Sequence, residues 1–248
     1  ALGYAESDPA ADVEGSDAAD KIAILSGLAF GGAINRAEIP TTGINLLQAI
    51  DVNYARKLGY GIKLLAIAEK DKTQSLLPKS QPLSIWVEPT LVPEENPLAG
   101  VSGVNNAILV EGNPIGQVMF FGPGAGSGPT ASAVVADILN IAGILSTNED
   151  KISNLDPLLS AKSWRSCHVS KKEQITKKNY IRLIAEDSPG VIGEIGTIFG
   201  QKKISIESIV QFDARNNEAE IVVITHKIKQ GSLKKALLNI NNLSQIER

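Results

Sequence analysis

The stretch YIRLIAEDSPGVIGEIGTIFG, residues 180–200, sets a strand pattern directly before a helix pattern. Its first part, YIRLIAE (180–186), is rich in the apolar and β-branched residues typical of strands. The turn that follows contains Pro189, a residue favoured at the start of a helix, and a helix is expected from Gly190 to Gln201. The stretch therefore predicts a strand, a tight turn and a helix in immediate succession.

The sequence after this unit continues the alternation of strands and helices. The expected elements are a strand at 204–212, a strand at 219–226 after the polar turn DARNNE, a helix at 232–241 and a short strand at 243–247. With the first strand and helix they give the order βαββαβ, which is the ferredoxin-like arrangement. The C-terminal part of the chain is therefore predicted to be a small domain of its own.

The segment before this domain, residues 147–178, turns polar and loses clear periodicity. It ends in a basic run, which we interpret as part of a solvated linker: Lys171, Lys172, Lys177 and Lys178. We therefore expect a first domain at 1–165, a linker at 166–178 and a second domain at 179–248.

The first domain is predicted to be α+β, with a mixed sheet and packed helices. Helices are expected at about 17–30, 42–58 and 130–145, and strands at 62–70, 83–92, 106–112 and 115–122. The last two strands are joined at Asn113-Pro114, which is typical of a hairpin turn. The helix at 130–145 consists mostly of small and apolar residues, so we expect it to be buried.

Composition limits the classes of function. The chain has 248 residues, 43% of them hydrophobic, and a formal net charge of −3. It can bury a core in two domains, but it lacks the global charge that attracts nucleic acid or an anionic membrane. Gly, Asn or charged residues interrupt its apolar runs short of the roughly 20 residues that a membrane span needs. We expect a soluble, cytoplasmic protein.

Cysteine and histidine are scarce. The single Cys167 excludes an intramolecular disulfide, which fits a reducing compartment. The two histidines, His168 and His226, are too far apart in the sequence to form a metal-ligand cluster. No metal site is expected.

The segment Gly3–Lys21 carries six carboxylates before the first lysine of the chain. Asp17 and Lys21 are four residues apart, so on a helix both side chains project from one face. One interpretation of this pair is an exposed ion pair of little consequence for stability.

A second interpretation gives the acids a function. The Pro- and Gly-punctuated stretch SDPAADVEG is expected to be a loop that folds Glu6, Asp8 and Asp12 back to the start of the helix. Carboxylates gathered there would hold a cationic substrate group, and Lys21 would act as a general acid.

The spacing E-x-D-P-x-x-D-V-x-G-x-D-x-x-x-K, residues 6–21, resembles the catalytic signature of homoserine dehydrogenases. The resemblance implies hydride transfer between NAD(P)H and L-aspartate 4-semialdehyde, which gives L-homoserine on the route to threonine, isoleucine and methionine. It implies that Glu6 binds the substrate amino group, that Asp12 and Asp17 help to hold the substrate, and that Lys21 donates or accepts the proton.

The glycine-rich segment GPGAGSGPTA, residues 122–131, precedes the helix expected at 130–145. Taken alone, it is a structural turn more often than a ligand site. It resembles a segment that lies near the dinucleotide in homoserine dehydrogenases, which implies that the cofactor side is lined by Gly122, Gly124, Ala125 and Gly126.

The family's nucleotide-binding domain, with a glycine fingerprint after its first strand, has no counterpart in these 248 residues. We therefore expect NADP or NAD to be bound mainly outside this chain, and the chain alone to be inactive. The alternative is a non-catalytic dimerisation and amino-acid-sensing module. An upstream strand followed by G-x-G-x-x-G would favour the enzyme.

The loop EDSPGVIGEIG, residues 186–196, resembles the ligand loop of ACT domains, which are amino-acid-sensing modules. The matching positions are Asp187, Pro189, Gly190, Val191 and Gly193. A helix N-terminus can take a carboxylate and Asp187 an ammonium, so an amino acid suits both ends and L-threonine is the expected effector. The alternative is a module that serves only in assembly. Exposed strand edges in both domains favour a homodimer or homotetramer.

Overall fold

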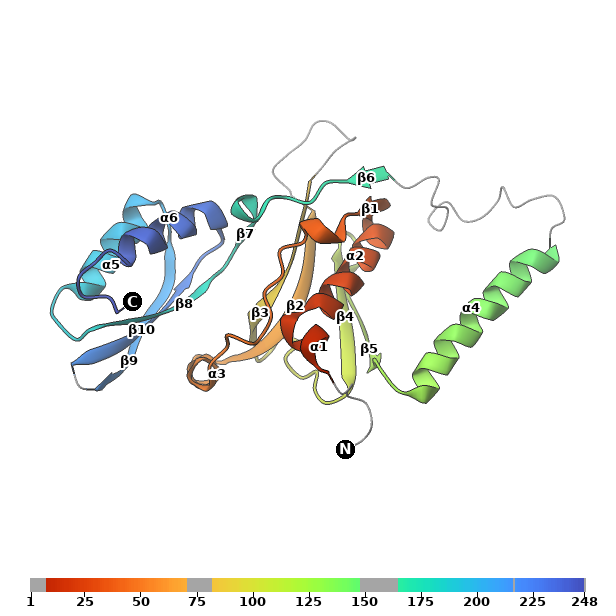
Figure 1. Ribbon diagram of the computed structural model, residues 1–248, viewed down its shortest axis with the longest axis horizontal. Coiled ribbons are helices and arrows are strands. Elements are labelled where there is room, and N and C mark those ends of the chain that lie inside the picture. Colours follow the sequence, from red (N-terminus) through yellow and green to blue (C-terminus); the bar gives the residue numbers. More distant parts are fainter. Residues whose placement is uncertain (1–7, 71–81, 148–164, 216, 248) are drawn as a thin grey trace.

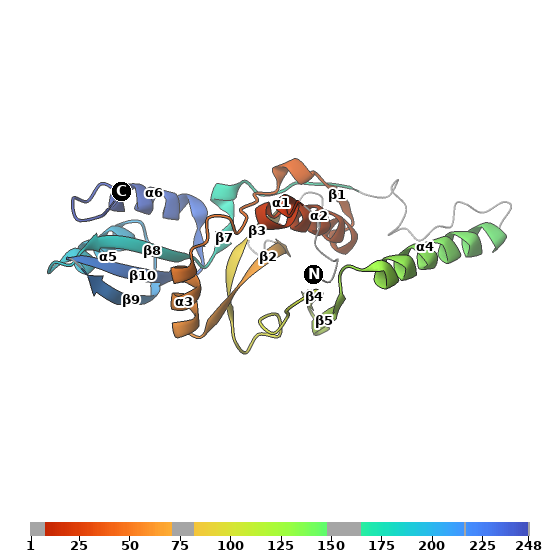
Figure 2. The same ribbon diagram turned by 60° about the horizontal axis from the view of Figure 1, so that its bottom comes forward.

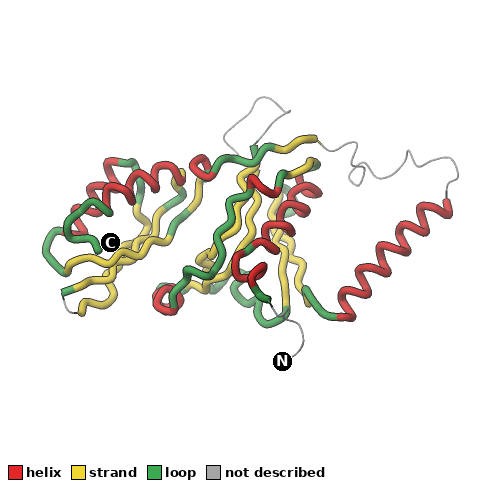
Figure 3. The backbone as a smooth tube through the Cα atoms, in the orientation of Figure 1, coloured by secondary structure: helices red, strands yellow, loops and turns green. Residues whose placement is uncertain are grey.

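The computed structural model describes residues 8–70, 82–147, 165–215 and 217–247. Figure 1 shows a central α/β domain, the C-terminal domain on one side of it, and helix α4 (Ser127–Thr147) extending away on the other. Figure 3 shows the same arrangement by secondary structure. The α+β class predicted from the sequence is confirmed.

Two helices separated by a single glycine open the described chain: α1 (Ala10–Glu14) and α2 (Ser16–Phe30). The carboxylate of Asp8 accepts a hydrogen bond from the N–H of Ala10 (3.0 Å), and Gly15 has a left-handed φ of 80°. The helix expected from residue 17 is confirmed. The loop expected before it is wrong, because Asp8 and Gly15 delimit a short helix.

Helix α2 packs on a two-stranded antiparallel sheet of β2 (Tyr60–Lys70) and β3 (Leu83–Pro93). The buried residues of this core are Ala19, Ile39, Leu83, Ile85 and Val87. A short parallel pair, β1 (Gly32–Ile34) with β6 (Arg165–Cys167), lies beside it. The strands expected at 62–70 and 83–92 are therefore confirmed.

Helix α3 (Ala49–Lys57) begins later than the helix expected from residue 42. The carboxylate of Asp51 accepts a hydrogen bond from the backbone N–H of Gln48 (3.1 Å), which fixes the helix start at that point. Residues 40–44 pair instead with β3 and α1, so tertiary contacts prevail over helical periodicity there. The short 3₁₀ helix η1 (Arg36–Glu38) precedes them.

Strands β4 (Asn105–Gly112) and β5 (Gly116–Pro123) form the expected antiparallel hairpin, with a cis peptide bond at Asn113-Pro114. The hairpin leads into α4, which confirms a helix over 130–145. The expectation that this helix is buried is wrong, because every residue from 127 to 146 is exposed. An apolar composition indicates that the helix surface is unfavourable in water, but it does not indicate which part of the protein, if any, buries that surface.

Helix α4 is also long and apolar enough, by length and composition alone, to cross a membrane. The expectation that every apolar run is too short is therefore wrong for this helix. Asp137 and Asn140 lie near its middle, where polar side chains are costly in a bilayer.

The C-terminal domain has the first five elements of the predicted βαββαβ order. Its elements are β8 (Tyr180–Glu186), α5 (Val191–Gln201), β9 (Ile206–Arg215), β10 (Glu218–Thr225) and α6 (Gln230–Ile240). The sheet order is β8-β10-β9, antiparallel throughout. The strand expected at 243–247 is reduced to one bridge, between Ala185 and Ile246, because the chain turns there after α6.

The segment expected to be a solvated linker contains regular structure. It includes the 3₁₀ helix η3 (Lys172–Gln174) and β7 (Thr176–Lys177), which pairs with β11 (Ile228–Lys229) of the C-terminal domain. Lys177 is an exception to the solvated interpretation of the basic run, because its side chain is only 14% exposed. Backbone pairing therefore ties this segment to the second domain.

Candidate active site

Asp17 and Lys21 lie one turn apart on α2, with Oδ2 and Nζ 2.6 Å apart. The side chains are 41% and 58% exposed, so the pair is open to a ligand and contributes little to stability by itself. On the opposite side of α2, Ala19 is fully buried against the sheet. The core thus fixes the rotation of the helix that presents the pair.

The structure gives positions for some of the other acids of the signature. Glu6 lies outside the described residues. Asp12 is exposed on α1, while Asp8 is engaged at the start of that helix. Among the described residues, the ion-pair partner of Lys21 is Asp17. The structure therefore brings Asp17 and Lys21 together, but it does not show the gathering of Asp8 and Asp12 around Lys21.

A loop that was not expected from the sequence holds α1 in place. The N–H of Thr42 donates to the carbonyl of Val87 on β3 (2.8 Å), and the N–H of Ile44 donates to the carbonyl of Val13 on α1 (2.8 Å). A Cβ on Gly43 would lie 2.2 Å from that same Val13 oxygen. The glycine inside the expected helix was the available signal for this close backbone contact.

A second ion pair lies on the exposed side of α2. The Nε of Arg36 is 2.6 Å from Oδ1 of Asp20, and its guanidinium also donates to the carbonyl of Ser16 at the start of α2 (3.4 Å). Arg36 comes from η1, so it ties that segment to the helix carrying Lys21. Nothing in the local sequence pattern pairs residues 16 positions apart.

The glycine-rich segment connects β5 to α4. Gly122 pairs with Asn106 on β4, and the N–H of Gly124 donates to the carbonyl of Val104 (3.2 Å). A Cβ on Gly124 would lie 1.3 Å from Nδ2 of Asn106, so a side chain at this position would displace the side chain of Asn106. Gly126 has a positive φ of 121°. Ala125 lies between these two glycines and is exposed.

The candidate effector loop joins β8 to α5. Asp187 accepts a hydrogen bond from Nε2 of Gln211 on β9 (3.1 Å), and its N–H donates to the carbonyl of Asn217 (2.8 Å). Pro189 precedes Gly190, which caps α5 with a left-handed φ of 101°. Val191 is buried in the domain core, whereas Gly193 is exposed. The loop is thus held by β9 and by the turn between β9 and β10.

Comparison with known proteins gives the family. A model of the homoserine dehydrogenase family matches residues 1–139, which is more than half of the chain. The chain belongs to the homoserine dehydrogenase family. A model of the ACT domain matches residues 179–245, so the C-terminal domain is an ACT domain. Both resemblances read from the sequence are confirmed at this level.

Relatives in this family are similar over the whole chain. A homoserine dehydrogenase of Synechocystis is 48% identical over 246 residues, covering 99% of this chain and 56% of the relative. One from Neisseria gonorrhoeae is 38% identical, covering 100% of this chain and 55% of the relative. The chain therefore spans about half the length of the curated relatives it matches.

A solved structure of the same family agrees with the fold. The homoserine dehydrogenase of Thiobacillus denitrificans superposes with a TM-score of 0.89 at 35% identity, covering 100% of this chain and 54% of that chain. The individual roles assigned to Glu6, Asp12, Asp17 and Lys21, to the glycine-rich segment and to the effector loop remain predictions.

Among the residues that the structure describes, no three His, Cys, Asp or Glu side chains gather closely enough to hold a metal ion. Cys167 is a free thiol, partly buried on β6.

Proposed function

We propose that this chain is the substrate-binding and regulatory part of an NAD(P)-dependent homoserine dehydrogenase, which interconverts L-homoserine and L-aspartate 4-semialdehyde. Threonine, isoleucine and methionine synthesis would use its product. The observation that carries the proposal is the exposed Asp17–Lys21 pair, 2.6 Å apart, within a sequence that has the family's signature spacing.

The proposed chemistry follows from the positions of these groups. Hydride transfer to an aldehyde carbon leaves negative charge on the oxygen, and an ammonium beside that oxygen neutralises it by donating a proton. Lys21 is the proposed donor, and it takes the proton back in the reverse direction. Asp17, in contact with Nζ of Lys21, would orient the ammonium. Asp12 and Glu6 are proposed to bind the substrate's amino group.

The nicotinamide cofactor, NADP or NAD, would supply the hydride when bound. Some residues of the glycine-rich segment, but not all of them, fit a position beside the cofactor. A Cβ on Gly122 would meet nothing within 4 Å, so the backbone there is open to a ligand. At Gly124 the space for a side chain is taken by Asn106, so packing rather than a ligand accounts for the glycine there. We propose that Gly122, Ala125 and Gly126 face the dinucleotide.

The proposal is tested with a chimera. The part of the Synechocystis relative that this chain does not match is joined ahead of residue 1, and NAD(P)-dependent oxidation of L-homoserine is followed by absorbance at 340 nm. We expect turnover by the chimera and none by the 248 residues alone. A soluble, folded chimera without turnover would favour the alternative, a non-catalytic dimerisation and sensing module.

A homodimer or homotetramer is proposed for the assembly. The hairpin of β4 and β5 exposes large apolar side chains whose contact with water is unfavourable: Ile108, Val110, Phe120 and Phe121. Sedimentation equilibrium gives the mass directly, and a monomer at micromolar concentration would contradict the proposal.

L-Threonine is the proposed effector, bound at the loop that contains Asp187 and at the N-terminus of α5. We expect Asp187→Ala to weaken threonine binding at least tenfold, because the substitution removes the partner of the ligand's ammonium. Isothermal titration calorimetry on the 248-residue chain measures this. The control is Glu194→Gln, an exposed charge in the first turn of α5.

Equal weakening in both variants would assign the effect to general electrostatics rather than to a ligand contact. If the unmodified chain binds no threonine and the chimera is not inhibited by it, the effector role is rejected and the assembly role remains.

A further inference from the structure

A buried carboxylate joins the ACT domain to helix α3 of the first domain. Asp51 is 8% exposed, and its Oδ1 accepts hydrogen bonds from the hydroxyl of Tyr180 (3.0 Å) and from Nε of Arg182 (2.8 Å). Its Oδ2 accepts the Gln48 N–H that starts α3. One carboxylate therefore both caps α3 and binds β8.

Arg182 is placed between two acids. Besides Asp51, its guanidinium contacts Oε2 of Glu220 on the neighbouring strand β10 (3.4 Å) and donates to the side chain of Gln48. Burial acts to lower the pKa of Arg182, but the hydrogen bond and charge of Asp51 raise it overall. Burial also raises the pKa of Tyr180, so that its hydroxyl remains a donor. Arg182 thus has a partner in each domain.

The same face of α3 makes an aromatic contact with the ACT sheet. The ring of Tyr54 stacks on that of Phe212 from β9, with centroids 4.1 Å apart, and Nζ of Lys57 lies over both rings at 5.6 and 5.4 Å. Tyr180 and Arg182 alternate along β8 with core residues, so they lie on the sheet face opposite α5 and α6. Figure 2 shows α3 beside this sheet.

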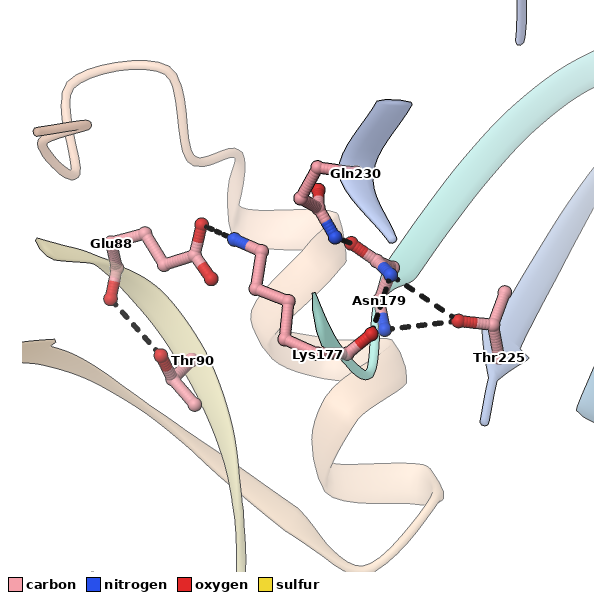
Figure 4. Close-up of polar contacts among 6 residues, drawn as sticks. All are labelled: Glu88, Thr90, Lys177, Asn179, Thr225 and Gln230. Atoms are coloured by element: carbon pink, nitrogen blue, oxygen red, sulfur yellow. Dashed lines mark hydrogen bonds and ion pairs between the residues drawn. The ribbon is translucent and has the colours of Figure 1, made fainter. Parts of the chain in front are cut away.

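A second contact fixes the strand that enters the domain. Lys177 forms an ion pair with Glu88 on β3 and lies 5.8 Å from the Trp86 ring centroid. Figure 4 shows how this lysine adjoins Asn179, which donates to the carbonyl of Lys177 (3.0 Å) and bonds Thr225 and Gln230 within the ACT domain. The chain is therefore anchored on both sides of Tyr180.

Both strands that hold α3 also hold the candidate effector loop. β8 runs from Arg182 directly into Asp187. On β9, Gln211 bonds Asp187 while the next residue, Phe212, stacks on Tyr54. On the other side of α3, the preceding loop bonds α1 through Ile44 and Val13. Two short routes therefore connect the effector loop to the helix pair of the candidate active site.

We propose that Arg182 is an interdomain latch that couples the effector loop to α3, through exchange between Asp51 of the first domain and Glu220 of its own. Held by Asp51, Arg182 fixes the start of α3 and the loop that supports α1. Released to Glu220, it leaves that start free. The regulatory consequence rests on the proposed function, but the coupling itself does not.

The coupling is measured by amide hydrogen exchange of residues 52–57 in the 248-residue chain. We expect Arg182→Met to raise exchange of these α3 amides at least threefold. Asp187→Ala is expected to raise it in the unmodified chain and to add nothing in the Arg182→Met background, because the latch transmits the perturbation. The control is Lys227→Met, which removes an exposed interdomain pair with Glu69. Tyr180→Phe, which keeps the ion pair, should give a smaller change.

Unchanged exchange in Arg182→Met, or equal effects of Asp187→Ala in both backgrounds, would overturn the proposal. In the chimera, Arg182→Met should raise the threonine concentration for half-inhibition at least tenfold and keep uninhibited kcat within threefold. A chimera without turnover refutes the proposed function alone, because the exchange measurement still decides whether Arg182 couples the loop to α3.

Discussion

Replacement of Lys21 by methionine in the chimera is expected to lower kcat roughly 10²- to 10⁴-fold, the usual contribution of a positioned general acid. Methionine keeps the length of the side chain and its packing on α2 but cannot donate a proton to the developing oxyanion. Lys21 is more than half exposed and lies outside the buried core, so the fold should survive. Steady-state kinetics and circular dichroism measure the two effects separately.

The matched control is Asp20→Asn on the same helix. Asp20 pairs with Arg36 rather than with Lys21, and it is exposed, so turnover should stay within about threefold. Asp17→Asn should raise KM as well as lower kcat if Asp17 holds substrate and also orients the lysine. Near-normal turnover of Lys21→Met would refute its role as the proton donor.

Gly43→Ala is expected to cost about 3 kcal/mol of unfolding free energy, at the upper end for overpacking of a tight site. A Cβ there would lie 2.2 Å from the carbonyl oxygen of Val13 and 2.6 Å from Cα of Glu14. These are backbone atoms, so relief requires α1 to move away from the loop. In the chimera kcat/KM should fall too, because α1 leads directly into the helix that carries Asp17 and Lys21.

Two other glycines separate this steric effect from the general effect of adding a methyl group. At Gly61 the nearest atom to an added Cβ is 4.0 Å away, so alanine should be nearly neutral. At Gly124 the clash is with the side chain of Asn106, which can rotate, so the cost should be intermediate. Urea unfolding of the three variants gives the order, and an equal cost at Gly43 and Gly61 would contradict the steric explanation.

The features of the candidate site that were predicted correctly depend on contacts between residues close in the sequence, whereas those that were missed depend on distant ones. The Asp17–Lys21 pair follows from a spacing of four on a helix, and the structure confirms it. The packing of α1 against the loop at Gly43 was missed, because helical periodicity around residue 42 says nothing about a partner segment 30 residues away. Similarly, the apolar pattern of α4 predicted a helix correctly but led to a wrong expectation of burial.

The sequence by itself determined most local elements: the βαββα order of the C-terminal domain, the four longer strands of the first domain, and the signature spacing that identified the family. These depend on periodicity, turn residues and caps, which act over a few residues. Only the tertiary structure decided where α3 begins and what it contacts. Asp51 and Arg182 are 131 residues apart in sequence, and their pairing depends on how two separately patterned domains pack together. No local pattern encodes that packing, because from the sequence alone each of these two residues would be expected to be an ordinary charged residue on the surface.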